Sequence, residues 1–331
     1  MEVANATYQK RKWITITELS NFARCPRRFF YKVGLGLRDV GPVAPLVFGE
    51  AIHKALPKVL EDDSVESGLD AFLSLWDESV SDEKRNTSRA RAMLKDFLAL
   101  RRPPKSIYNL LHPPGGLIDI SDRSSDWEIP FAIDIGLDIP LCGRIDGWAK
   151  HRDCNEKYAV EFKTSSEVST RLFKGFETNP QIIGYATVLR VMGEDVKGTI
   201  LDVLRVSNVR TETQSHLISV SSQMSDSFLK WANYIGSSIL SCEELAEKMA
   251  KEEGTSDPNL DDSSLADSWP QQWSGCNPYA MFGMPGRTCE YTPLCKVQDW
   301  TSLTSIYETG RHIPFTLQTD NGDSSKETSN A

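Results

Sequence analysis

Apolar residues alternate with other residues along positions 129–141, and this alternation is the strongest pattern in the chain. Every second position from 129 to 141 is Ile, Phe or Leu. An apolar residue at every second position is the period of a strand with one buried face. Gly136 predicts a turn or bulge inside the stretch. Shorter strands are expected at residues 144–149, 158–163 and 199–206.

The first hundred residues have a helical period instead. Leu19, Phe22 and Phe29 fall on the inner side of a helix that Thr17 could cap and that Pro26 is expected to kink. Further helices are predicted at residues 46–60 and 88–101. Proline and glycine then gather between residues 103 and 116, which predicts a connecting loop.

One more helix is predicted between the last two strands. Asn179 is its expected N-cap, Pro180 its first residue, and Gly193 stands just past its end. Strands followed by a helix and another strand favour an α/β fold, a mixed β-sheet core flanked by helices. The expected regions are a helical N-terminal region (1–125), the core (126–235), a C-terminal helical segment with cysteines (236–310) and a tail (311–331) of disordered composition.

Charge is distributed unevenly along the 331 residues. The net charge is −9, which is unusual for a protein that binds nucleic acid. Residues 1–40, however, hold eight basic and three acidic residues, for a net +5, whereas residues 241–270 have a net charge of −7. Both runs could be solvated helix faces, or the first could form a basic track that includes Arg27 and Arg28.

Cellular location is suggested by what the pattern lacks. We find no apolar run of the roughly 18 residues that a membrane span needs, and no secretory signal pattern at the start. The seven cysteines are odd in number and unevenly spaced, which argues against a disulfide framework. We therefore expect a cytoplasmic protein of a bacterial, archaeal or phage-infected cell, without membrane contact.

Carboxylates and a lysine lie on the polar face of the predicted strand at residues 158–163. Strand alternation puts Glu161 and Lys163 on one face, about 6.6 Å apart. Asp146 lies on the preceding strand, and an antiparallel hairpin would place it beside Glu161. Carboxylate oxygens can hold Mg²⁺ or Mn²⁺, and a lysine can stabilise the charge that develops on a phosphate during hydrolysis. The same spacing also occurs in ordinary solvated hairpins.

Five motifs add context to these residues. They are residues 20–37 (S-N-F-A-R-C-P-R-R-F-F-Y, then G-L-G-L), Phe48-Gly49-Glu50-Ala51-Ile52-His53, Gly143-Arg144-Ile145-Asp146, Val160-Glu161-Phe162-Lys163-Thr164, and Gln181 with Tyr185. In this order they resemble the RecB-type branch of the PD-(D/E)xK nucleases, which includes RecB and AddB nuclease domains and CRISPR-associated exonucleases. The resemblance implies a restriction-endonuclease-like fold.

The resemblance also implies roles for individual residues. His53, Asp146, Glu161 and the backbone carbonyl of Phe162 would hold the metal, and Lys163 would be the catalytic lysine. Gln181 and Tyr185, one helical turn apart, would meet the DNA strand or brace the site. Arg144, on the strand face of Asp146, is a candidate phosphate contact. Glu128 could approach the site, but we interpret it as structural.

Four cysteines form the second implied site. In the iron-sulfur members of this branch, one cysteine near the start and three near the end hold a [4Fe-4S] cluster. Cys25, Cys276, Cys289 and Cys295 match that arrangement, although twelve residues separate Cys276 from Cys289 where the best-known members have two. Zinc held by the same cysteines, or incidental buried thiols, are the alternatives.

The leading interpretation is a metal-dependent exonuclease that degrades or trims DNA ends, preferring single strands, in recombination, repair or phage DNA metabolism. Two alternatives are a CRISPR spacer-processing nuclease and a non-catalytic DNA-end-binding subunit of a larger complex. The chain has no G-x-x-x-x-G-K-(S/T) phosphate loop, so helicase activity would have to come from a partner protein.

Overall fold

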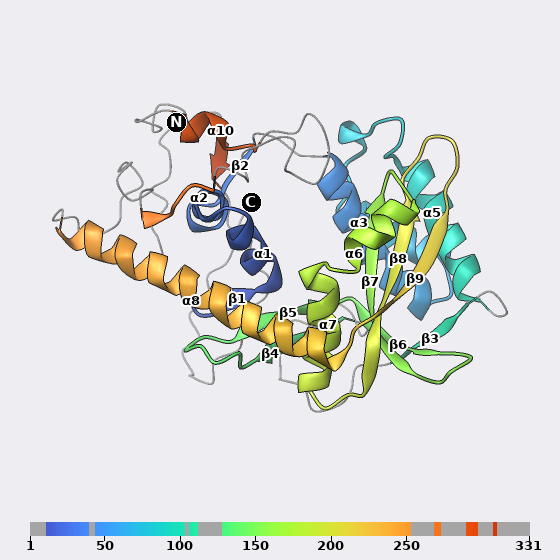
Figure 1. Ribbon diagram of the computed structural model, residues 1–331. Coiled ribbons are helices and arrows are strands. Elements are labelled where there is room, and N and C mark those ends of the chain that lie inside the picture. Colours follow the sequence, from blue (N-terminus) through green and yellow to red (C-terminus); the bar gives the residue numbers. More distant parts are fainter. Residues whose placement is uncertain are drawn as a thin grey trace, which may run out of the picture.

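A mixed five-stranded sheet, on the right in Figure 1, is the larger of the two sheets beside which the helices pack. The computed structural model describes residues 11–39, 44–102, 106–111, 128–252, 268–272, 289–296 and 307–309. The sheet has the order β3-β6-β7-β8-β9, and only β7 and β8 pair in parallel. Its strands are β3 (Tyr108–Leu111), β6 (Gly147–His151), β7 (Lys157–Ser165), β8 (Val196–Arg205) and β9 (Thr213–Ser219).

Helices cover both faces of this sheet. One face packs on α3 (Ala44–Glu61), α4 (Val65–Leu73) and α5 (Thr87–Arg101), and their core includes Val160 and Phe162 of β7. The other face packs on α6 (Thr170–Phe176) and α7 (Pro180–Val191). The predicted α/β fold with a mixed sheet and flanking helices is therefore confirmed.

A smaller sheet lies beside the first. It contains β4 (Ile129–Ile133), β5 (Leu141–Ile145) and the short β1 (Ile14–Thr15), in the order β1-β5-β4. The alternating stretch thus forms two strands joined by a turn, and Gly136 in that turn has the positive φ of 79° that favours glycine. The single strand predicted at residues 144–149 is wrong, because the chain passes from one sheet to the other at Asp146.

Helix boundaries follow local capping chemistry. α7 begins as predicted, with the Asn179 side chain accepting a hydrogen bond from the Gln181 N–H, and Gly193 beyond its end has a φ of 95°. Thr17 was the wrong cap for the first helix, α1 (Ile16–Arg24): Thr15 caps it, in a capping box with Glu18. Pro26 begins a separate short helix, α2 (Pro26–Phe29), instead of kinking α1.

The prediction from residue patterns also missed some elements. They include α4, α6, β9 and β3, the last of which lies inside the expected loop at 103–116. The long α8 (Ser222–Glu252) crosses α7 and continues past α1 (Figure 1). No helix among the described residues is long and apolar enough to cross a membrane.

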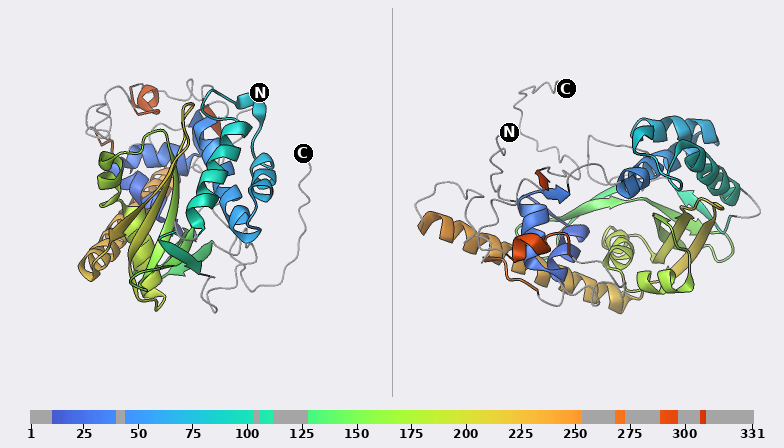
Figure 2. Two further views of the ribbon diagram at one scale, coloured as in Figure 1. Left: turned by 90° about the vertical axis from the view of Figure 1, so that its right-hand side faces the viewer. Right: turned by 90° about the horizontal axis from the view of Figure 1, so that it is seen from above.

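The N-terminal and C-terminal parts of the chain pack together in a region that we call the terminal clasp, formed by residues 11–39, 268–272, 289–296 and 307–309 (Figure 2). β2 (Leu37–Asp39) pairs antiparallel with β10 (Tyr307–Thr309), and α10 (Thr292–Cys295) lies nearby. Trp269 is fully buried in the clasp against three phenylalanine rings, those of Phe22, Phe29 and Phe30. Residues more than 200 positions apart therefore share one core.

Candidate active site

Asp146 occupies the junction between the two sheets. The pairing of β6 with β7 starts at Gly147 and Val160, which places Asp146 next to Glu161 as the hairpin predicts. The Phe162 N–H, which lies beyond this pairing, donates a hydrogen bond to Asp146 Oδ2 at 2.9 Å. A carboxylate thus fills the position where β6 would otherwise continue beside β7.

Glu161 is the most deeply buried acid of the site. Its side chain is fully buried and forms an ion pair with Lys163. Burial, together with the negative charge of Asp146, raises the pKa of Glu161 to about 8, against the effect of Lys163. Although burial opposes the positive charge of Lys163, the carboxylates of Glu161 and Asp146 raise the pKa of that lysine. Two adjacent acids, one of them fully buried, favour a bound cation.

His53 reaches the same point from α3. Its Nδ1 lies 3.6 Å from Asp146 Oδ2. Burial lowers the pKa of His53 more than Asp146 and a hydrogen bond to the Phe162 backbone raise it, so the ring is neutral at pH 7 and suited to metal coordination. Gly49, one turn earlier, allows this approach, since a Cβ there would lie 3.2 Å from Thr164 Oγ1 of β7.

Gln181 and Tyr185 face the site from α7. The Gln181 Nε2 donates to the Tyr185 hydroxyl at 2.8 Å, and Tyr185 is buried. Burial, followed by the charges of Glu161 and Asp146, raises the pKa of Tyr185 well above its usual value. The hydroxyl is therefore neutral and remains a hydrogen-bond donor close to the carboxylates.

Arg144 lies at the edge of this group, where its Nη1 is 3.1 Å from Glu128 Oε2. The negative charge of Glu128 acts on the pKa values of both His53 and Tyr185. Glu128, which the residue pattern assigned to a structural role, thus lies within electrostatic reach of the site. Its position opposite Asp146 could be inferred from sequence only with the register of β4 and β5.

The two predicted N-terminal DNA contacts lie in the terminal clasp. Arg28 is buried and pairs with Glu290 at 2.5 Å and with Asn21. Arg27 Nε donates to the Trp269 carbonyl at 3.0 Å. This arrangement does not favour DNA contact by Arg28, because its charge is already used inside the protein.

The predicted cluster cysteines are partly described. Cys25 and Cys289 are buried, Cys295 is half-buried in α10, and Cys276 lies outside the described residues. Cys25 Sγ accepts a hydrogen bond from the Gln272 N–H at 3.5 Å, and Cys25 and Cys289 both act electrostatically on Arg24. Within the described ranges, no three His, Cys, Asp or Glu side chains are arranged as a metal-binding group, at the active site or here.

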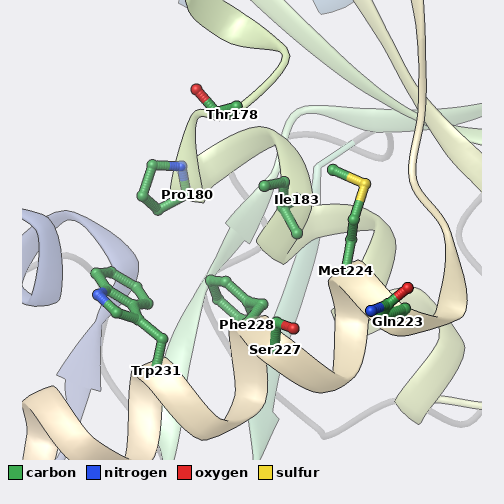
Figure 3. Close-up of a pocket in the computed structure, with 8 residues that line it drawn as sticks. All are labelled: Thr178, Pro180, Ile183, Gln223, Met224, Ser227, Phe228 and Trp231. Atoms are coloured by element: carbon green, nitrogen blue, oxygen red, sulfur yellow. The ribbon is translucent and has the colours of Figure 1, made fainter.

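A separate pocket of about 430 Å³ lies on another side of α7, between that helix and α8 (Figure 3). Pro180, Ile183, Phe228 and Trp231 contribute its apolar lining. None of the predicted catalytic or metal-binding residues lines this pocket.

Comparisons with known proteins support a nuclease. The model of the family described as the PD-(D/E)XK nuclease superfamily matches residues 14–296. A search of curated proteins finds no match. A solved structure titled "Crystal structure of SSO0001" is 14% identical, with 69% of this chain and 76% of that chain covered and a TM-score of 0.30. On the family match, which spans most of its length, the chain belongs to the PD-(D/E)XK nuclease superfamily.

Proposed function

We propose that this nuclease is a metal-dependent DNA exonuclease that hydrolyses phosphodiester bonds at DNA ends and prefers single strands. The observation that carries the proposal is the adjacency of Asp146, Glu161 and Lys163 on one hairpin edge. The choice of ends and of single strands depends on the resemblance of the sequence motifs to RecB-type exonucleases. A role in recombination, repair or phage DNA metabolism, with a helicase as a possible partner, has the same basis.

Asp146, Glu161, the Phe162 carbonyl and neutral His53 would hold the ion. Three of these ligands supply oxygen, which suits Mg²⁺ or Mn²⁺. Burial and the charge of Asp146 raise the pKa of Glu161 to about 8, so a cation at this carboxylate would offset the cost of burying its negative charge. When bound, the ion would polarise the phosphate and lower the pKa of a water molecule.

The chain's own residues would do the remaining work. Lys163 would stabilise negative charge that develops on the phosphate, from a position fixed by its ion pair with Glu161. Tyr185, oriented by Gln181, offers a neutral hydroxyl as a donor beside the carboxylates. Burial of Glu161, Tyr185 and Phe162 excludes water, which strengthens these electrostatic interactions.

We further propose that Cys25, Cys276, Cys289 and Cys295 hold a [4Fe-4S] cluster with a structural role. Support comes from the position of Cys25 and Cys289, both buried next to Arg24 in the terminal clasp. Anaerobically purified protein is expected to be brown and to contain iron and acid-labile sulfide in near-equal amounts. Stoichiometric zinc in a colourless, iron-free preparation would contradict the cluster without affecting the nuclease assignment.

The test of the activity uses internally labelled DNA in four forms: linear single-stranded, linear double-stranded, circular single-stranded and circular double-stranded. The proposal predicts that linear single strands disappear fastest, that circles persist, and that Mn²⁺ or Mg²⁺ is required. The Glu161→Gln protein serves as the inactive control. If circular DNA were cleaved as fast as linear DNA, the protein would be an endonuclease and not an exonuclease. Binding of DNA ends without cleavage would favour the non-catalytic end-binding alternative.

A further inference from the structure

Glu128 and Arg144 flank Asp146 on the smaller sheet. β4 and β5 pair antiparallel with Ile129 opposite Ile145, so the next step of this register places Glu128 opposite Asp146. Arg144 precedes Asp146 by two residues and Pro130 by register lies opposite Arg144. The Arg144 Nη1 and Glu128 Oε2 are 3.1 Å apart, and about a quarter of each side chain is exposed (24% and 25%). The pair is therefore held at the site but remains accessible to a ligand.

Glu128 belongs electrostatically to the site and not only to the sheet. The negative charge of Glu128 raises the pKa of His53, although burial lowers that pKa by more. It also adds to the burial that raises the pKa of Tyr185. These two residues come from α3 and α7, on opposite faces of the large sheet, so Glu128 lies near the point where both helices converge.

The net charge of the site depends on Arg144. The site brings together three acids, Glu128, Asp146 and Glu161, and two permanent cations, Arg144 and Lys163. With all three acids ionised the group carries one negative charge, and a divalent ion would change this to one positive charge. A phosphodiester carries one negative charge, which the loaded site would neutralise. Without Arg144, the net charge of the loaded site would be zero, and the negative charge of the phosphate would not be neutralised.

We propose that Arg144 binds a phosphodiester of the substrate strand and that Glu128 is the positioning residue that orients the Arg144 guanidinium. A guanidinium offers five N–H donors in a planar fork, so one edge can pair with a carboxylate while another binds phosphate oxygens. An oriented guanidinium holds the bound phosphate in the geometry that hydrolysis requires. This inference rests on the proposed function, because it assigns how the same site recognises its substrate.

The phosphate contact is tested by binding, with cleavage removed. In a Lys163→Ala background with Mg²⁺, anisotropy of a fluorescent oligothymidylate is measured over a range of salt concentrations. Loss of one phosphate contact on a single strand lowers the slope of log affinity against log salt by about 0.7. Arg144→Ala should show this decrease, and Arg144→Lys should keep the slope. The control Arg102→Ala, which removes an exposed arginine paired with Asp63 at 2.7 Å, should change nothing. An unchanged slope for Arg144→Ala would overturn the phosphate assignment.

The positioning role is tested by cleavage kinetics with Lys163 intact. Glu128→Gln removes a negative charge, so KM for DNA should stay the same or fall, while kcat falls about tenfold because the guanidinium is no longer oriented. Combining Glu128→Gln with Arg144→Lys should cost no more than Arg144→Lys alone. The proposal would be overturned if kcat were unchanged and Glu128→Gln and Arg144→Lys lowered thermal stability equally. The pair would then be a structural contact only. A wild-type protein that cleaves no DNA would refute the proposed function, whereas the salt slopes would still decide the role of Arg144.

Discussion

The active site and the terminal clasp use charged residues in opposite ways. In the active site, Asp146, Glu161 and Lys163 lie within 18 positions of one another, and burial raises the pKa of Glu161 to about 8. In the clasp, Arg28 pairs with Glu290 over 262 positions, and Arg11 of the clasp pairs with Glu243 of α8 over 232 positions; both pairs have hydrogen-bond geometry. Buried charge that the fold does not fully compensate costs stability. The charged groups of the active site therefore lower the stability of the protein, whereas the paired charges of the clasp raise it.

The two regions should therefore respond differently to mutation. Changes to the active-site charges should lower activity without unfolding the protein, whereas changes to the clasp core should lower stability and leave the specific activity of the folded protein almost intact. The predictions below test this difference, beginning with the largest expected effect.

The largest effect is expected for the active-site charges. Asp146→Ala, Glu161→Ala and Lys163→Ala should each lower the cleavage rate by at least about a thousandfold, because each removes charge from one metal and phosphate site. Double variants should be no worse than single ones, since the three residues act as a unit. Single-turnover assays measure this, with Lys197→Ala, an exposed lysine paired with Asp195, as the control. Additive losses would mean that the three residues do not share a site.

A large loss of stability is expected for the clasp core. Trp269→Ala removes a fully buried indole that contacts three phenylalanine rings and should lower the free energy of unfolding by about 3–5 kcal/mol. Denaturant titration measures the free energy of unfolding. The control is Tyr234→Ala, at a residue that is 70% exposed, and it should lower the free energy of unfolding by less than about 0.5 kcal/mol. The folded Trp269→Ala protein should still cleave DNA; a catalytic loss as large as that of Lys163→Ala would remove the distinction between the regions.

A smaller effect is expected from pH. The pKa of Glu161 is raised to about 8, so below that pH the metal-free site holds a proton that the ion must displace. Metal affinity should thus rise about tenfold per pH unit up to about pH 8 and then level off. The stability of the metal-free protein should change in the opposite direction and fall as pH rises. A raised carboxyl pKa stabilises the fold at low pH, and this contribution is lost as pH rises from about 4.5 through about 8. Melting temperatures with and without Mn²⁺ measure both trends, and Glu161→Gln should remove them.

Local pattern was sufficient where neighbouring residues determine the structure. The alternation at residues 129–141 and the cap at Asn179 correctly predicted strands and the start of α7, and the hairpin correctly predicted that Asp146 lies beside Glu161. The choice between Thr15 and Thr17 as the cap could also have been made, since Glu18 stands three residues after Thr15.

Distant contacts were not predictable in this way. Arg28 looked like part of a basic surface because its partner, Glu290, is 262 positions away. The chain passes from one sheet to the other at Asp146 because β5 and β6 pair with different strands. This pairing is not visible in the local sequence. The place of Glu128 opposite Asp146 was not predictable for the same reason, as it depends on the register of β4 and β5 across a turn.

Direct measurement of Mn²⁺ binding by titration calorimetry at pH 8.5 tests the central claim, that Asp146 and Glu161 form a divalent-metal site in this nuclease. We predict that the wild-type protein binds Mn²⁺, that Asp146→Asn and Glu161→Gln each weaken binding by about tenfold or more, and that the exposed control Asp195→Asn binds like the wild type. Equal Mn²⁺ affinity in the wild-type and Glu161→Gln proteins would contradict the account.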